Sequence, residues 1–270
     1  PIPVARYMVQ ATQAVGGIHV RLSPYDNRVV DIKFFDSHGL DIDRAAERTI
    51  ENVFFREDYR RVYLDEIGKI QYQNGVNETY IKGFFEALRS EAVAAIANRF
   101  NVVVDYANAN ASTIPSTVFR RLGCDVVELN ANINEARIFQ TPQEFEAGMR
   151  QLGAIVPVLN AELGVRLDPG GEKTFVVDDR GRRLTGLQTL AVLTDLMLRC
   201  NPGGTVAVPV DMPRAFEEIA RRHGGTIVRT RASLASLMQI GAANLGYLLL
   251  GDASGNLIFP LFYPVADGLF

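Results

Sequence analysis

The feature that most limits the possible folds is an alternation of short apolar runs with segments of helical periodicity. Val102 to Asp105 and Asp125 to Leu129 predict two strands, with a helix between them. Further on, Thr205 to Val210 and Thr226 to Thr230 predict two more strands around another helix. A strand, a helix and a strand in this order are typical of α/β proteins.

Three consecutive α/β units with mixed sheets and flanking helices are predicted. Polar boundaries predict units at residues 1–75, 76–184 and 185–270. A length of 270 residues suits such a division. After Asn256 the chain is predicted to form one last strand, and it ends at Phe270 within what is predicted to be a further helix.

Composition argues against several classes of protein. Hydrophobic residues make up 47% and charged residues 22% of the chain, which is the ordinary balance of a globular protein. A net charge of -3 argues against an electrostatic grip on nucleic acid, and no apolar run reaches the length of a membrane span. No charged and then apolar signal segment begins the chain, so a cytoplasmic location is expected.

Gly164 to Gly181 predicts a strand, a tight loop and a second strand, because Pro169 to Gly171 interrupt the apolar alternation. The loop carries Asp168, Glu172 and Lys173. Such groups could hold a divalent cation against a phosphate, because hard cations prefer oxygen ligands. The same residues also fit an ordinary hairpin with solvated charges.

The βαβ unit that begins at Val102 also suggests a dinucleotide-binding oxidoreductase. In that class a glycine triad follows the first strand, so that a pyrophosphate can approach the backbone. The corresponding segment here, DYANANAS, contains no glycine. The sequence therefore argues against this class.

Three loops together resemble the phosphohexomutase family, the phosphoglucomutases and phosphomannomutases. Residues 16–39, GGIHVRLSPYDNRVVDIKFFDSHG, are similar to the family's GGI…TASHNP…YNGIKF…DG and align without a gap. Residues 163–181 are similar to the metal-binding stretch with its DGDGDR core, and GDASGN at 251–256 is similar to the sugar loop GEMSGH. VVVDYANANAS and VVELNANINE in the middle unit support the resemblance, which covers essentially the whole chain and implies a phosphoglucomutase-like fold.

The resemblance implies an intramolecular phosphotransfer that interconverts hexose 1- and 6-phosphates through a phosphoserine. Ser23 falls at the phosphoserine position and Lys33 at that of the acid/base lysine. The residues at the substrate and metal positions are Lys173, Asp252, Ser254, Asp168 and Glu172. Magnesium is the implied cofactor and a hexose phosphate the implied partner. Taken alone, Ser23 also fits a turn serine, and Lys33 a surface lysine on an edge strand.

Several residues depart from the family pattern. Gly170 stands where the second metal aspartate is expected, and Glu172 lengthens the third. Because magnesium demands near-octahedral order, we expect it to bind poorly here. Lys173 replaces an arginine, Asn256 replaces a histidine, and residues 24–26 replace the His-Asn-Pro that follows the serine.

Two hypotheses about function stay open. The first is a phosphohexomutase with impaired catalysis, in which the family's fourth domain and the start of its first domain are expected to be absent. The second is a non-catalytic module that binds sugar phosphate or organises a partner. Similar degenerate loops occur in mutase-like modules joined to sugar-phosphate nucleotidyltransferases such as mannose-1-phosphate guanylyltransferase.

Overall fold

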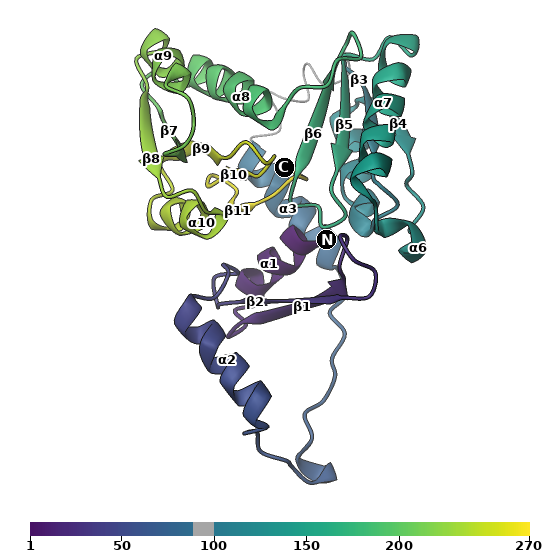
Figure 1. The fold of residues 1–270 in the computed structure, drawn as a ribbon, viewed down its shortest axis with the longest axis vertical. Coiled ribbons are helices and arrows are strands. Elements are labelled where there is room, and N and C mark those ends of the chain that lie inside the picture. Colours follow the sequence, from purple (N-terminus) through teal and green to yellow (C-terminus); the bar gives the residue numbers. More distant parts are fainter. Residues whose placement is uncertain (89–99) are drawn as a thin grey trace.

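The computed structural model describes residues 1–88 and 100–270, whose strands form three separate sheets. The molecule has one lower and two upper lobes, and α1 (Ile2–Ala11) and α3 (Val76–Leu88) lie where the lobes meet (Figure 1). The helix predicted from Tyr80 to Asn98 begins earlier, and its part beyond Leu88 lies outside the described residues. Among the helices described, none combines the length and apolar character needed to cross a bilayer.

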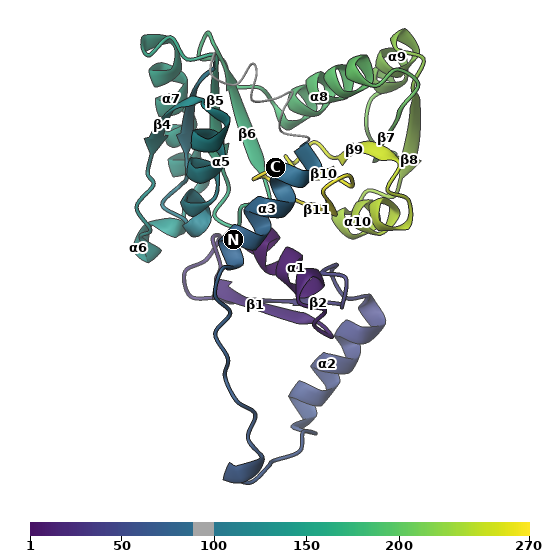
Figure 2. The same ribbon diagram turned by 180° about the vertical axis from the view of Figure 1, so that it is seen from behind.

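The lower lobe is built on an antiparallel hairpin of two strands. Its elements after α1 are β1 (Gly17–Leu22), β2 (Val30–Phe35), α2 (Arg44–Arg56) and the short 3-10 helix η1 (Leu64–Glu66). The Asp43 carboxylate accepts a hydrogen bond from the Ala46 N–H and so caps the start of α2. Residues 51–75 are all exposed, and in both views the chain there extends away from the rest of the molecule (Figures 1 and 2).

The middle lobe contains a four-stranded sheet in the order β4-β3-β5-β6. Its elements after α3 are β3 (Asn101–Asp105), η2 (Asn110–Thr113), α5 (Pro115–Leu122), β4 (Asp125–Leu129), α6 (Glu135–Ile138), α7 (Pro142–Val158), β5 (Leu163–Leu167) and β6 (Thr174–Asp178). The first three strands of that order are parallel, and β6 pairs antiparallel with β5, as the predicted hairpin requires. Thr141 and Glu144 form a capping box that begins α7.

The third lobe contains a five-stranded mixed sheet in the order β11-β10-β9-β7-β8. Its elements are α8 (Gly186–Cys200), β7 (Thr205–Pro209), α9 (Ala215–Arg222), β8 (Thr226–Thr230), α10 (Leu234–Ala243), β9 (Tyr247–Gly251), β10 (Leu257–Phe259) and β11 (Tyr263–Ala266). Val206 and Val208 of β7 pack with α8 and α9, whereas Ala207 packs with α10. Because side chains alternate along a strand, these helices cover opposite faces of the sheet.

The lobes are joined by apolar packing around α1. The Tyr7 ring contacts Tyr80 of α3 at a centroid distance of 5.5 Å and stacks on Phe262 at 5.4 Å. One buried cluster includes Val4 of α1, Phe84 of α3 and residues of β3. Side chains from different predicted units therefore share a core, and the unit boundaries themselves stay a prediction.

The end of the chain differs from the sequence-based expectation. Two strands, β10 and β11, follow Asn256 in place of one, and residues 267–270 are not helical. The prediction of a terminal helix is wrong because residues 263–266 form β11, which pairs antiparallel with Ile258 and Phe259 of β10. The Asp267 carboxylate then accepts hydrogen bonds from the Tyr80 hydroxyl at 2.6 Å and the Leu269 N–H at 2.9 Å, which holds this segment against α3.

Candidate functional site

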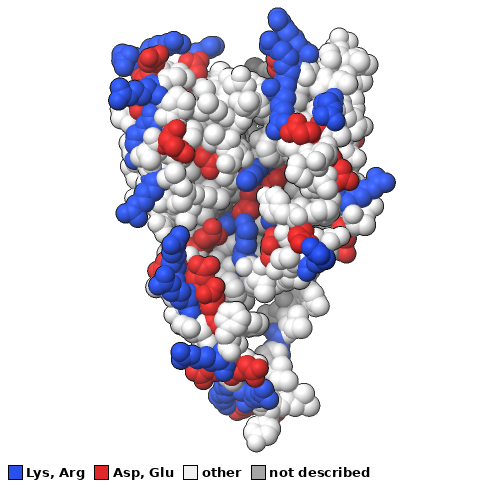
Figure 3. Space-filling view, viewed as in Figure 1, with Lys and Arg blue, Asp and Glu red and all other residues white. Residues whose placement is uncertain are grey.

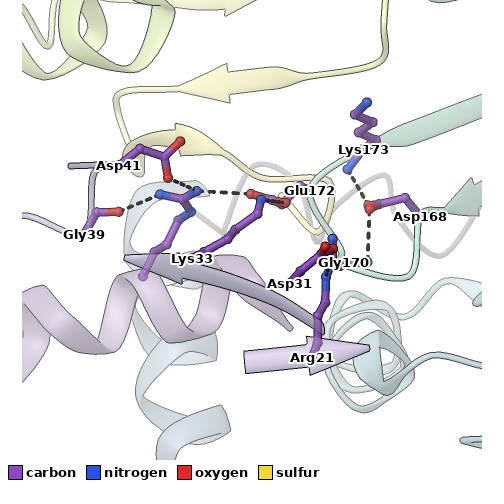
Figure 4. Close-up of polar contacts among 10 residues, drawn as sticks. Arg21, Asp31, Lys33, Gly39, Asp41, Asp168, Gly170, Glu172 and Lys173 are labelled. Carbon is purple, nitrogen blue, oxygen red and sulfur yellow. Dashed lines mark hydrogen bonds and ion pairs between the residues drawn. The ribbon is translucent and has the colours of Figure 1, made fainter. Parts of the chain in front are cut away.

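The loop from Asp168 to Lys173 joins β5 to β6 and lies at the meeting point of the lobes (Figure 4). The Asp168 carboxylate accepts hydrogen bonds from the Gly170 N–H at 3.0 Å and the Lys173 N–H at 2.7 Å. Burial raises the pKa of Asp168, and these two N–H groups partly oppose that rise. Gly171 adopts a φ of +75°, which glycine tolerates best. Asp168 therefore already holds the backbone of its own loop.

Glu172 is a buried carboxylate held by two cations from the lower lobe. Its Oε2 lies 2.6 Å from Lys33 Nζ, and its Oε1 lies 3.3 Å from an Arg6 nitrogen. Arg6 is fully buried and also donates to Asp41 Oδ1 at 2.6 Å and the Gly39 carbonyl at 3.0 Å (Figure 4). Burial alone would raise the pKa of Glu172, but the charges of Lys33 and Arg6 outweigh it and hold that pKa below its ordinary value.

Lys33, the residue at the acid/base position, contacts the acidic loop, where its ammonium group is paired with Glu172. On β2 it stands opposite His19 of β1. A lysine held against a carboxylate at 2.6 Å donates hydrogen bonds. The carboxylate of Glu172 therefore partly neutralises the positive charge of Lys33.

Ser23 follows β1 and is only 6% exposed. The Ser23 N–H donates a hydrogen bond to the Val29 carbonyl at 2.8 Å. The Ser23 hydroxyl oxygen accepts a hydrogen bond from the Tyr25 N–H at 3.4 Å. Pro24 and Tyr25 line a cavity of about 470 Å³ together with Asp168 and Lys173. The serine loop and the acidic loop thus share a cavity, while the serine residue itself is enclosed.

The loop from Gly251 to Asn256 approaches the acidic loop from the third lobe. Lys173 and Asn256 form a backbone bridge, and the Thr174 N–H donates to the Gly255 carbonyl at 3.2 Å. The Asp252 carboxylate accepts hydrogen bonds from the Ser254 N–H and the Asn256 side chain, both at 2.8 Å. The predicted sugar-binding residues Asp252 and Ser254 therefore lie on a loop that touches the acidic loop directly.

The residues present do not fit a magnesium ion. Asp168 supplies a carboxylate, Gly170 supplies none, and Glu172 is neutralised by Lys33 and Arg6. Over residues 1–88 and 100–270, no three His, Cys, Asp or Glu side chains gather as metal ligands. Magnesium needs several oxygen ligands in octahedral order, and these residues do not supply them.

Two cationic residues of the site were not predicted from the sequence. Arg6 lies on the first helix, and Arg21 lies on β1 opposite Asp31. The signal for Arg6 was a charged residue among the apolar side chains of an amphipathic helix. The signal for Arg21 was its place two residues before Ser23, on the same side of the strand as His19.

Charged side chains also gather where the lobes meet. Figure 3 shows Lys and Arg atoms beside Asp and Glu atoms in the hollow between the two upper lobes. Positive and negative groups are interspersed on this part of the surface.

The comparisons with known proteins agree with the fold. Residues 1–61 match a model of phosphoglucomutase/phosphomannomutase α/β/α domain I, and residues 78–181 match domain II of the same family. Together these matches cover more than half of the chain. The chain is 29% identical over 270 residues to a phosphoglucomutase/phosphomannomutase of Thermococcus kodakarensis, covering 99% of this chain and 58% of that protein. It is 26% identical to a protein of Pyrococcus abyssi named as a probable phosphoglucosamine mutase, again covering 58% of it.

A solved structure has the same fold. A phosphoglucomutase/phosphomannomutase family protein of Burkholderia thailandensis matches with a TM-score of 0.77 at 21% identity, over 100% of this chain and 58% of that one. The chain thus spans less than two thirds of the length of these relatives. The matched domain models, the sequence relatives and the shared three-part fold together show that this chain belongs to the phosphoglucomutase/phosphomannomutase family, the phosphohexomutases.

Proposed function

We propose that this chain binds a hexose phosphate where its three loops meet, and that it turns this ligand over slowly or not at all. One observation carries the proposal: the acidic loop contacts Lys33 of the lower lobe through Glu172 and the 251–256 loop of the third lobe through Lys173. Three segments far apart in the sequence therefore meet at the acidic loop, which lines one cavity of about 470 Å³ together with Pro24 and Tyr25. Relatives named as mutases of hexose and hexosamine phosphates support this class of ligand.

Each residue of the proposed site has a physical role. Lys173 lines the cavity of about 470 Å³ and supplies a positive charge for a phosphate. Asp252 and Ser254 supply a carboxylate and a hydroxyl for the sugar hydroxyl groups. In a catalytic cycle of the family's type, Ser23 Oγ would carry a phosphoryl group and Lys33 would move a proton.

Two features oppose efficient turnover. Ser23 is only 6% exposed, so little of its surface is open to an incoming phosphoryl group. The ammonium group of Lys33 is held 2.6 Å from Glu172, so it must leave that partner before it can donate a proton to a ligand. Phosphoryl transfer depends on positioned charges around the transferring group, and the metal that would supply one does not fit here.

Calorimetric titration with glucose 1-phosphate and mannose 1-phosphate tests binding. We expect Lys173→Gln to weaken the affinity at least tenfold. Lys69→Gln is the matched control, because Lys69 is exposed in the segment between α2 and α3 and should leave the affinity unchanged. Equal affinities of the two variants would contradict the proposed site.

A coupled mutase assay with a sugar bisphosphate activator tests catalysis. We expect turnover at background, unchanged by Ser23→Ala. Sustained turnover that Ser23→Ala abolishes would show that the serine is a working phosphoryl carrier. The non-catalytic part of the proposal would then be wrong.

A second candidate is a sugar-phosphate-binding or assembly module within a nucleotidyltransferase polypeptide. The enclosed serine and the paired lysine favour a role in binding, which such a module would have. The genomic reading frame on either side of the chain tests this candidate. A nucleotidyltransferase sequence in the same frame would support it, and a complete mutase in that frame would refute it.

A further inference from the structure

Arg21 carries a positive charge that the described residues leave incompletely paired. Its Nε and one terminal nitrogen, NH1, are buried and have no hydrogen-bond partner among residues 1–88 and 100–270. The carboxylate of Asp31 on β2 lies 3.6 Å from Nε, which is beyond hydrogen-bond distance. Burying N–H groups of a guanidinium without partners is costly, so this position favours a ligand that would accept from them.

A cavity of about 280 Å³ lies beside this guanidinium. It is lined by Pro1 and Ile2, by β1, by residues of η2 and α6, and by the turn at Pro169 and Gly170. Its polar side chains are those of His19, Arg21, Asn110 and Glu135. Burial, together with the positive charges of the Pro1 amino group and of Arg21, lowers the pKa of His19 to about 4, so this imidazole is neutral at physiological pH. Its Nδ1 also lacks a partner in the described part of the chain.

The guanidinium lies close to where the family's second metal aspartate would project. A Cβ atom built on Gly170 would stand 2.7 Å from Arg21 NH1 and 3.0 Å from Asp168 Oδ2. In Figure 4 the Arg21 side chain rises from β1 toward Gly170, next to the loop that carries Asp168. A fixed positive charge therefore stands beside Asp168, in the part of the loop where the family places its cation.

We propose that Arg21 binds the phosphate group of the ligand directly and that this binding needs no divalent cation. A guanidinium presents a rigid fork of N–H donors that matches a phosphate in two hydrogen bonds. Asn110 and neutral His19 offer further polar contacts from the walls of the same cavity. The identity of the ligand as a hexose phosphate rests on the proposed function, whereas the anion site rests on Arg21 alone.

The nearby carboxylates do not exclude an anion. Asp168 is held by two backbone N–H groups, and Glu172 by Lys33 and Arg6. Glu135 is exposed at the edge of the cavity and can turn into solvent. Asp31 remains the competitor for the guanidinium, at a distance that leaves its hydrogen bonds unmade.

Titration with inorganic phosphate in the presence of EDTA tests the proposal, with the melting temperature and calorimetry as readouts. We expect phosphate to bind and to raise the melting temperature equally with EDTA and with magnesium. Arg21→Gln should weaken phosphate binding at least tenfold, and Arg21→Lys should give an intermediate loss because it keeps the charge without the fork. Arg28→Gln is the matched control, because Arg28 belongs to the same hairpin but is exposed and paired with Asp26.

Three outcomes would overturn the proposal: phosphate that binds only with magnesium, no phosphate binding to the wild type, or equal binding by folded Arg21→Gln and wild type. Circular dichroism verifies that each variant is folded. Hexose phosphates separate this proposal from the proposed function. If glucose and mannose 1-phosphates bind no more tightly than inorganic phosphate, the proposed function fails while the Arg21 site stands. If a hexose phosphate binds through Lys173 and Arg21→Gln leaves that binding unchanged, the Arg21 site fails while the proposed function stands.

Discussion

Restoring the family's carboxylates should create a magnesium site only if Arg21 is removed as well. In the double variant Gly170→Asp with Glu172→Asp, the new side chain at 170 begins 2.7 Å from Arg21 NH1, so its carboxylate should pair with the guanidinium. Adding Arg21→Thr frees that carboxylate, and threonine suits a strand. The backbone permits an aspartate at position 170, because the positive φ in this loop belongs to Gly171 and not to Gly170.

The expected effect follows from binding to the folded state alone. At about 10 mM magnesium, a dissociation constant of about 0.1 mM adds about 2.7 kcal/mol to the free energy of unfolding. For a chain of this size that corresponds to a rise of about 5–10 °C in melting temperature. A wild-type dissociation constant of about 10 mM or weaker adds at most about 0.4 kcal/mol, or about 1 °C.

Differential scanning fluorimetry with and without magnesium, at matched ionic strength, measures this effect. Each variant is compared with itself, so the cost of loosening Glu172 from Lys33 and Arg6 cancels. Gly68→Asp is the control, because it adds a carboxylate where a side chain meets no other atom within 4 Å. If the double variant responds as strongly as the triple variant, the role given to Arg21 is wrong. A strong magnesium response of the wild type that Asp168→Ala removes would show a working metal site.

Three further predictions concern stability and domain structure. Burial raises the pKa of Asp267 from 3.8 to about 6, so the folded state holds this proton more tightly than the unfolded state. The contribution of Asp267 to stability should therefore fall by about 3 kcal/mol as pH rises from about 4 to about 6, and urea unfolding should show that Asp267→Asn removes this dependence. Asp105→Asn leaves buried Arg166 without its charged partner and should lower the free energy of unfolding by about 3–5 kcal/mol, measured in urea. Limited proteolysis should cut first near residue 75, where residues 51–75 are exposed, and near residue 185, whereas early cleavage within 102–129 would refute the unit boundaries.

The sequence predicted best those elements whose signals are local. The strands at 125–129 and 226–230 have the predicted bounds, because apolar periodicity and turn residues delimit them within a few positions. The segment after Asn256 was predicted wrongly. Its strands are fixed by pairing with each other and with β9, and Asp267 is fixed by Tyr80, which is 187 positions away.

The sequence pointed to some residues of the candidate site, but not to Arg6 or Arg21 and not to the pairings between its side chains. Family resemblance located Lys33 and Glu172, yet nothing in the sequence places them 2.6 Å apart across 139 positions. Arg6 reaches Glu172 across 166 positions. A titratable side chain takes its state from such neighbours, so assigning Glu172 to a metal from sequence overlooked the cations that pair with it.

The crowding of Gly170 by Arg21 also limits how a chain like this can change stepwise. An aspartate at 170 alone meets the guanidinium, and an aspartate at 172 alone withdraws from Lys33 and Arg6. In the alignment with the family's TASHNP, position 21 is a threonine. Replacing Arg21 by threonine alone removes a positive charge beside Asp168 and supplies no carboxylate. Each single replacement toward the family pattern thus loses an interaction before a metal can compensate, so these three positions are expected to change together or not at all.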